Sequence, residues 1–213
     1  MKIKQLEKLQ DLVDSDFSWR KKELFNIKLM INSSKNPILC RMGIAMLSAH
    51  FEGFLKQIAN YYVVFVSSQN ISLSQLKTNF VAIHSANVFR ICENTDKVSV
   101  YKKAMDDFLN NYNTKKFQVK YSQEKPVIKT EGNPSSTVVK NIFDSIGLDF
   151  APYETKSNYI DADLLSNRHA VVHGEKREVT VEEFNDTFKH ILEIMEQFSE
   201  QIIQAAINKE YLK

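Results

Sequence analysis

Residues 37–67 read PILCRMGIAMLSAHFEGFLKQIANYYVVFVS, and their apolar side chains would cover nearly every face of a helix. A surface helix carries one apolar stripe, so this helix needs neighbours on several sides. Pro37 suits the first helical position and Asn36 suits the cap before it. We therefore expect the buried central helix of a bundle, with apolar positions Leu39, Met42, Leu47, Phe51, Phe54, Leu55, Ile58, Tyr62 and Val63.

Two long helices are predicted beside the central one. Residues 3–33 contain neither Gly nor Pro and place Leu24, Ile27 and Ile31 at helical spacing, which predicts a helical hairpin with the central helix. Thr180 and Glu183 form a capping-box pattern. After it, apolar residues recur every three or four positions, which predicts one long amphipathic helix. Its apolar stripe would face the core or, alternatively, a second copy in a dimer. The stripe consists of Phe184, Phe188, Ile191, Met195, Phe198, Ile202 and Ala205.

The shorter elements are predicted from caps and alternation. Ser72 with Gln75 resembles a capping box that opens a third helix, and Asn133-Pro134 would start a short helix closed by Gly147. Residues 117–121 alternate like a strand, so a small β-hairpin insertion near 115–130 is predicted, with a mobile insertion as the alternative. The expected fold class is all-α, an up-and-down helical bundle forming a single domain over residues 1–213.

Composition agrees with long helices and excludes some classes of partner. Five Gly and four Pro are few for a β-sandwich, and the net charge of +2 gives no overall field for binding nucleic acid or a membrane. The N-terminus lacks a secretory signal, and no stretch approaches the roughly 20 apolar residues of a membrane span. Cys40 and Cys92 match no metal-ligand spacing. We expect a cytoplasmic protein with free thiols, no cofactor and no metal site.

One segment carries recognisable chemistry: RHAVVH, residues 168–173, followed by Gly174. On a regular helix Arg168 and His173 would point roughly 140° apart, although Gly174 favours a loosened last turn. The segment offers a permanent cation and two imidazoles, a set suited to a phosphodiester. RNA supplies its own 2′-hydroxyl nucleophile, so cleavage needs a base, an acid and a cation, and no metal.

The chemistry of RNA cleavage suggests a role for each of the three polar residues of this segment. His173 is the candidate base or acid, Arg168 would stabilise the developing negative charge, and His169 is a second proton-transfer group or a positioning contact. A symmetric dimer would bring a second Arg168 and His173 to the site. In the alternative, structural interpretation, Arg168 pairs with Asp163 or Asp161 and His173 only caps the helix.

The motif resembles that of the HEPN superfamily: Arg, a polar residue, three further residues and His. His169 stands where the family often has Asn. Residues 17–24 (FSWRKKEL), 49–56 (AHFEGFLK) and 161–165 (DADLL) are similar to the HEPN-like nuclease branch of bacterial conflict systems. The resemblance implies an all-α, dimeric, metal-independent endoribonuclease acting in phage defence or as the toxin of a toxin–antitoxin pair. It implies RNA as substrate and an antitoxin or defence-system protein as partner.

Three further residues are supporting candidates for the site. Glu52 and Lys56 lie one turn apart on the apolar central helix, where an ionisable group is costly unless paired. Lys56 or Arg168 would pair with Glu52, either as a structural salt bridge or as part of the site. Asp163 is the third. His50, His84 and His190 are given no role.

Basic residues near the predicted hairpin suggest a second contact with RNA. Five lysines are interleaved with Phe117 and Tyr121: Lys115, Lys116, Lys120, Lys125 and Lys129. They could form a stacking surface for single-stranded RNA, or they could be the solvated side chains of an ordinary lysine-rich hairpin. The alternatives to a nuclease are a non-catalytic HEPN module that binds a nucleotide or a partner protein, and a helical scaffold.

Overall fold

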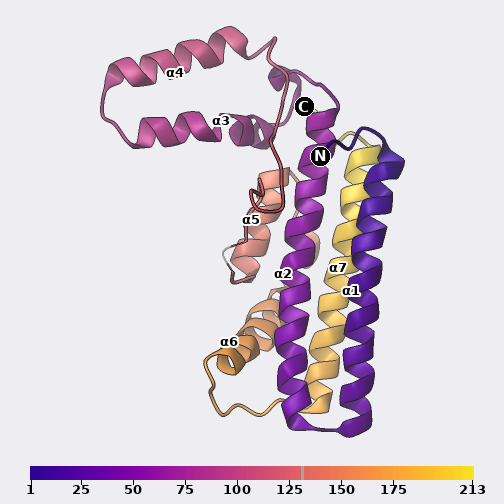
Figure 1. Ribbon diagram of the computed structural model, residues 1–213. Coiled ribbons are helices and arrows are strands. Elements are labelled where there is room, and N and C mark those ends of the chain that lie inside the picture. Colours follow the sequence, from indigo (N-terminus) through magenta and orange to yellow (C-terminus); the bar gives the residue numbers. More distant parts are fainter. Residues whose placement is uncertain (131) are drawn as a thin grey trace.

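Three long helices run side by side along the molecule in a computed structural model that describes residues 1–130 and 132–213 (Figure 1). They are α1 (Leu6–Ser34), α2 (Pro37–Ser68) and α7 (Val181–Ile207). The Asn36 side chain accepts a hydrogen bond from the Ile38 amide at 2.9 Å and so begins α2, as predicted. The Thr180–Glu183 capping box is also confirmed, with both of its hydrogen bonds formed at the start of α7. The all-α bundle is thus confirmed.

The central position of α2 is visible in the packing around Gly43. A Cβ atom there would lie 2.6 Å from the Ile31 side chain of α1 and 2.7 Å from the Phe184 ring of α7. The glycine therefore lets three helices approach closely. The expectation that no segment is long and apolar enough to span a membrane was wrong. By length and composition α2 qualifies, with mean hydropathy 1.3 over its best window, of which 50% is buried inside the bundle. Its contacts with α1, α7 and two shorter helices account for this apolar character.

The remaining helices lie against one side of α2 or project from its end. Helices α5 (Ser136–Ile146) and α6 (Ser166–Val172) pack on α2, whereas α3 (Thr78–Glu93) and α4 (Val98–Asn111) extend outward as an arm (Figure 1). Every side chain of α4 is at least partly exposed. Short turns link these helices: 3-10 turns at Leu73–Gln75 and Ala151–Lys156 and a π-helix at Tyr159–Leu165.

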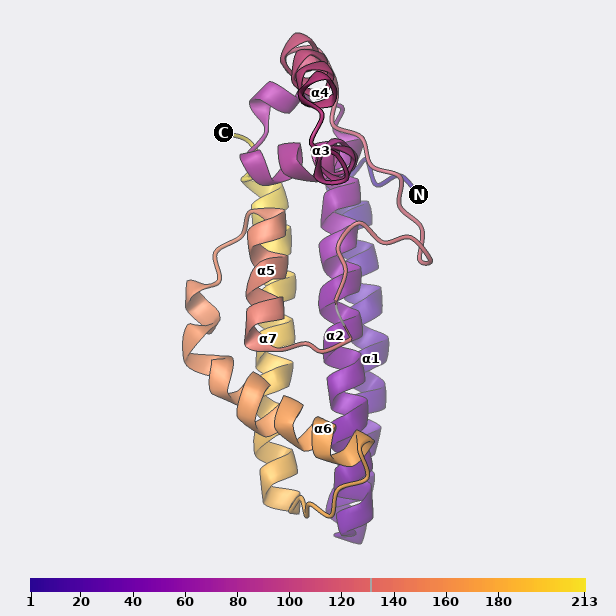
Figure 2. The same ribbon diagram turned by 90° about the vertical axis from the view of Figure 1, so that its left-hand side faces the viewer.

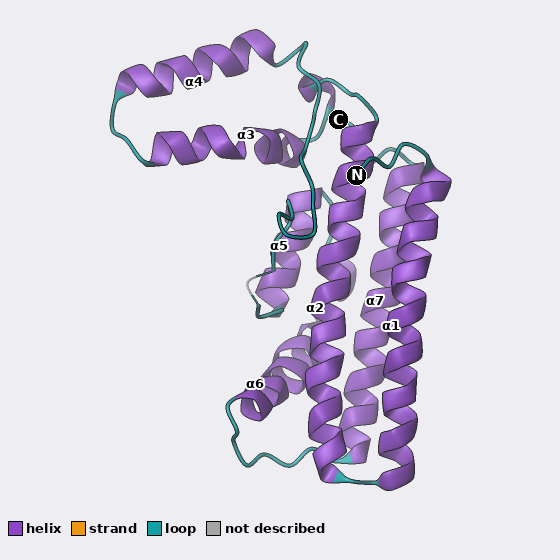
Figure 3. Cartoon of the chain, viewed as in Figure 1, coloured by secondary structure: helices purple, strands orange, loops and turns teal. Residues whose placement is uncertain are grey.

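The predicted β-hairpin near 115–130 was wrong, because this segment pairs with α2 side chains instead of with a second strand. Figure 3 shows it as a loop, and the described residues hold two isolated β-bridges but no strand. The Asn60 Oδ1 atom accepts hydrogen bonds from the Val127 and Ile128 amides at 2.8 and 3.0 Å, and Ser67 Oγ accepts one from Val119. The side chains of this segment do alternate between buried and exposed, as the buried Phe117 shows, but the segment packs on helix α2 and not on a second strand.

Two predicted helix starts also need correction. The Ser72 hydroxyl accepts a hydrogen bond from Lys116 Nζ at 3.0 Å and caps no helix, so a 3-10 turn forms and α3 begins only at Thr78. Ser135, not Asn133, caps α5 through a bond from the Val138 amide. Gly147 ends α5 with a φ of +73°, in the left-handed region that favours glycine, as predicted.

Candidate functional site

The motif lies on α6, a two-turn helix that crosses in front of α2 (Figure 2). The π-helix at Tyr159–Leu165 leads directly into α6 and packs on α7. Such wide turns occur frequently at functional sites because they reorient the side chains that follow. Asn167 anchors the junction: its side chain is buried and donates a hydrogen bond to the Asp163 carbonyl at 2.7 Å. The start of α6 is therefore fixed and its C-terminal end faces solvent.

His169 and His173 lie side by side at this exposed end. Their ring centroids are 4.2 Å apart with the planes tilted by 50°. The His173 amide donates to the His169 carbonyl at 3.0 Å, so the helical hydrogen-bond pattern reaches the cap residue, but the φ of −86° and ψ of 5° at His173 have already left the helix. The predicted loosening before Gly174 is thus observed at His173 itself, the last residue before the glycine. Gly174 follows with a φ of +71° and ends the helix. The pair that the fold brings together is His169 with His173.

The side chain of Arg168 points to Gly132, in the segment that precedes α5. Its Nη2 atom donates to the Gly132 carbonyl at 3.2 Å and its side chain is half-buried. Within residues 1–130 and 132–213 it forms no ion pair with Asp163 or Asp161, so the structural pairing considered from the sequence is not observed. Asp161 accepts from the Ser136 amide at 2.7 Å and from its hydroxyl. Among the described residues, Arg168 makes no other side-chain hydrogen bond.

Glu52 reaches the same loop from α2. Its Oε1 atom accepts a hydrogen bond from the Thr130 hydroxyl at 2.6 Å. The expected ion pair of Glu52 with Lys56 or Arg168 does not occur among the described residues, since this hydroxyl satisfies the carboxylate instead. Lys56 is half-buried and its carbonyl accepts from the Asn60 side chain. Glu52 therefore contacts Thr130 and Arg168 contacts Gly132.

Asp163 is positioned near the start of α6 in an acidic environment. Burial raises the pKa of its carboxyl group, and the negative charges of Asp186 and Glu183 raise it further, against smaller opposite effects of His190 and Arg177. Its carbonyl, rather than its carboxylate, holds Asn167. Asp163 thus contacts the start of α6 through its backbone carbonyl.

A shallow hollow of about 320 Å³ adjoins His169. Its lining includes His169, Asp161, Glu175 and Asn133. Arg41 of α2 donates to the Glu175 carbonyl at 2.9 Å, which ties the loop after α6 to the central helix. The site therefore consists of two exposed imidazoles, one cation and a hollow with two carboxylates at its edge.

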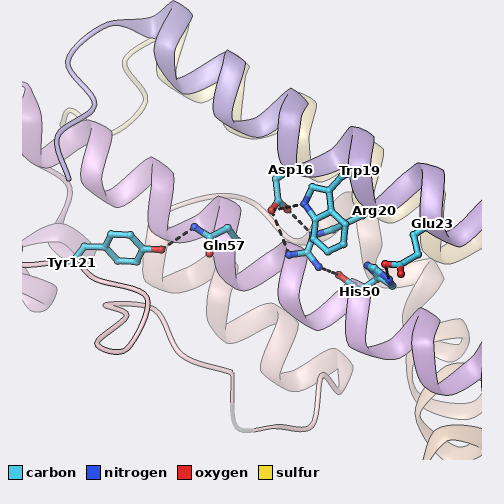
Figure 4. A network of polar contacts seen from close by, with 7 residues as sticks. All are labelled: Asp16, Trp19, Arg20, Glu23, His50, Gln57 and Tyr121. Carbon is cyan, nitrogen blue, oxygen red and sulfur yellow. Dashed lines mark hydrogen bonds and ion pairs between the residues drawn. The ribbon is translucent and has the colours of Figure 1, made fainter.

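A second polar cluster joins α1 and α2 (Figure 4). Arg20 Nε binds Asp16 Oδ2 at 2.6 Å and Arg20 donates to the His50 carbonyl, while His50 Nε2 lies 3.0 Å from Glu23 Oε2. Burial lowers the pKa of His50, against the opposing charge of Glu23. His50 is two positions from Glu52, so the two side chains point roughly 160° apart on α2. This cluster connects two of the segments that resemble HEPN nucleases and lies away from the motif.

His190 has contacts that its sequence position did not reveal. Its ring stacks on Tyr159 of the π-helix with centroids 3.6 Å apart, and its nitrogens lie 3.5 Å from Asp186 and 3.6 Å from Glu193. It therefore fastens the π-helix to α7. The π-helix, which has no sequence signature, places Tyr159 against the His190 ring, so the sequence did not predict this contact.

The proposed lysine-rich stacking surface is not formed as expected. All five of its lysines are exposed, but Phe117 is fully buried and the Tyr121 hydroxyl accepts a hydrogen bond from Gln57 at 2.8 Å. The Phe117 ring is thus unavailable for stacking on a base. The solvated interpretation of these lysines fits the observed segment.

Comparison with known proteins gives one match. A family model described as RiboL-PSP-HEPN matches residues 15–204. The matched range begins in α1, includes the motif on α6 and ends in α7, and it confirms the resemblance to the HEPN superfamily. No curated protein and no solved structure matches the chain.

Proposed function

Because the chain belongs to the RiboL-PSP-HEPN family, we propose that it is an endoribonuclease that cuts RNA without a metal ion. The observation that carries this proposal is the pairing of two exposed imidazoles, His169 and His173, beside Arg168. An imidazole can remove or supply a proton near neutral pH, and a guanidinium stabilises phosphate charge. These are the groups that RNA transesterification requires.

The reaction would proceed through attack of the 2′-hydroxyl on the adjacent phosphorus. His173 accepts the 2′-hydroxyl proton as the 2′-oxygen–phosphorus bond forms, and a protonated imidazole donates a proton to the departing 5′-oxygen as its bond to phosphorus breaks. The products are a 2′,3′-cyclic phosphate and a free 5′-hydroxyl. Arg168 binds the phosphate oxygens, where negative charge grows in the transition state.

The geometry of one chain favours a site built from two copies. In-line displacement places the attacking and leaving oxygens on opposite sides of phosphorus. The His169 and His173 rings have centroids only 4.2 Å apart at one helix end, so both would face the same side of a bound phosphate. A second copy, related by two-fold symmetry, would supply His173 and Arg168 from the other side. We therefore propose a homodimer as the active form.

Exposed methionines mark the surface on which the second copy would pack. Met42 and Met46 of α2 are 57% and 38% exposed, and with Met30 of α1 they line an apolar hollow of about 110 Å³. The Arg41–Glu175 contact places this part of α2 beside the end of α6, where Val172 is also exposed. Methionine is enriched in protein interfaces. We propose that this surface brings two α6 ends together.

The cellular role follows from the family only in outline. We propose that the enzyme acts in the cytoplasm in phage defence or as a toxin, held in check by an antitoxin or a defence-system protein. The other candidate, a non-catalytic HEPN module, would use Arg168 and the histidines to hold a nucleotide or a partner without cleavage.

The test is cleavage of labelled mixed RNA in EDTA by wild-type protein, Arg168→Ala and His173→Ala. Arg90→Ala, on the arm, and His84→Gln are controls that remove the same charge or ring elsewhere. Loss of one proton-transfer group typically costs about 10²–10⁴-fold in rate, and loss of one group that stabilises transition-state charge costs about 10²–10³-fold. We therefore expect both site variants to lose at least about 100-fold while the controls keep the wild-type rate. Intact RNA with all five proteins would contradict the nuclease and support the binding module.

A further inference from the structure

His169 and His173 also have the spacing of a metal-chelating pair. Two histidines four positions apart on one helix face are the arrangement that binds zinc in helical metal sites. The 3.0 Å hydrogen bond from the His173 amide to the His169 carbonyl preserves this helical spacing at the cap. With ring centroids 4.2 Å apart, small side-chain rotations can direct one nitrogen of each ring at a common point.

Both rings are available for coordination. Each histidine is exposed, and among residues 1–130 and 132–213 neither ring makes a hydrogen bond or an ion pair. Arg168, which precedes His169 in the sequence, is directed at the Gly132 carbonyl. The described residues hold no group of three or more ligands, so the pair would supply two ligands and water would have to supply the others.

The surroundings favour a cation of the transition-metal class. His169 lines its hollow together with the acidic residues Asp161 and Glu175, and the hollow of about 320 Å³ leaves room for water ligands. Imidazole prefers zinc, copper and nickel, whereas magnesium and calcium prefer oxygen ligands. We propose that His169 and His173 of one chain chelate one divalent transition-metal ion, and that this ion inhibits the enzyme.

Inhibition, unlike binding, rests on the proposed function. A ring nitrogen that coordinates a metal has no lone pair with which to accept a proton. A bound ion would therefore remove His173 and His169 from proton transfer together and would place a hydrated cation where the ribose must approach. The same two side chains would then serve catalysis without metal and regulation with it.

The test begins with calorimetric titration of the full chain with zinc chloride, without RNA. We expect His169→Ala and His173→Ala each to bind one zinc ion per chain fewer than wild type. His84→Gln is the control and should keep the wild-type stoichiometry. Both histidines are exposed, and circular dichroism spectra verify that the variants are folded. Equal zinc binding by all four proteins, or one ion shared by two chains, would overturn the proposal.

A second measurement adds zinc to the RNA cleavage reaction of the wild-type protein. Zinc at a saturating concentration should reduce the rate at least about tenfold, and excess EDTA should restore it. Zinc bound at the pair without slowing cleavage would overturn the inhibitory role. If the metal-free protein leaves RNA intact, the proposed nuclease function fails, whereas the titration still decides whether the zinc site exists.

Discussion

Asp163 carries an electrostatic penalty at neutral pH that one substitution should remove. Because burial and the charges of Asp186 and Glu183 raise its pKa, the folded state holds its proton more tightly than the unfolded state does. The penalty is fully present above the raised pKa and disappears as the pH falls below the ordinary carboxyl value. We expect Asp163→Asn to raise Tm at pH 7, with the gain shrinking toward pH 4, as measured by thermal unfolding.

Asp161→Asn is the matched control for this prediction. Its carboxylate is exposed and accepts two hydrogen bonds from Ser136 at the start of α5. Replacing it with an amide should therefore lower Tm at neutral pH. Stabilisation by Asp161→Asn together with destabilisation by Asp163→Asn would show that the charges around the π-helix are wrongly assigned.

Sequence reasoning identified the residues of the motif but not their partners. Residue types and spacing singled out Arg168, His169 and His173. The partner of Arg168 is a backbone carbonyl thirty-six positions earlier, and the partner of Glu52 is a hydroxyl seventy-eight positions later. No local pattern encodes such contacts, because the loop that provides them is placed by packing against α2.

Among the elements, Gly43 controls how closely α1, α2 and α7 pack. Gly43→Ala would place a methyl group 2.6 Å from the Ile31 side chain and 2.7 Å from the Phe184 ring. Overpacking costs about 1–3 kcal/mol, of which the better helix propensity of alanine offsets roughly 0.5–1. We expect urea denaturation to show a free energy of unfolding lower by about 1–2 kcal/mol.

A second substitution tests the cause of this loss. Phe184→Leu removes the ring that the new methyl group would strike, so Gly43→Ala should cost less in a Phe184→Leu background than in the wild type. Equal costs in the two backgrounds, or a Gly43→Ala protein as stable as wild type, would contradict the close packing described for these helices.

Elements with strong local signals were predicted and elements shaped by tertiary contacts were not. Asn36-Pro37 and the Thr180–Glu183 capping box mark their helix starts through adjacent residues, and both are confirmed. The segment after Lys115 alternates like a strand, yet Asn60 and Ser67 of α2 provide its hydrogen bonds. The π-helix at Tyr159–Leu165 has no sequence signature.

At the scale of the whole molecule, the proposed dimer should depend on the methionine surface of α2. We expect Met42→Lys to halve the molar mass measured by light scattering and to abolish RNA cleavage, because a buried unpaired charge opposes association. Met105→Lys on α4 is the matched control, since Met105 and Met42 are both 57% exposed. A Met42→Lys protein that stays dimeric and active would exclude this surface as the interface.

Cleavage by the RNA's own 2′-hydroxyl leaves characteristic groups at the ends of the products. The measurement is mass spectrometry of RNA fragments produced in EDTA, with a fully 2′-O-methylated RNA of the same sequence in parallel. We expect 2′,3′-cyclic phosphate ends from wild type, almost none from His173→Ala, and an uncut methylated RNA. Fragments with 3′-hydroxyl ends, or cleavage of the methylated RNA, would contradict attack by the 2′-hydroxyl.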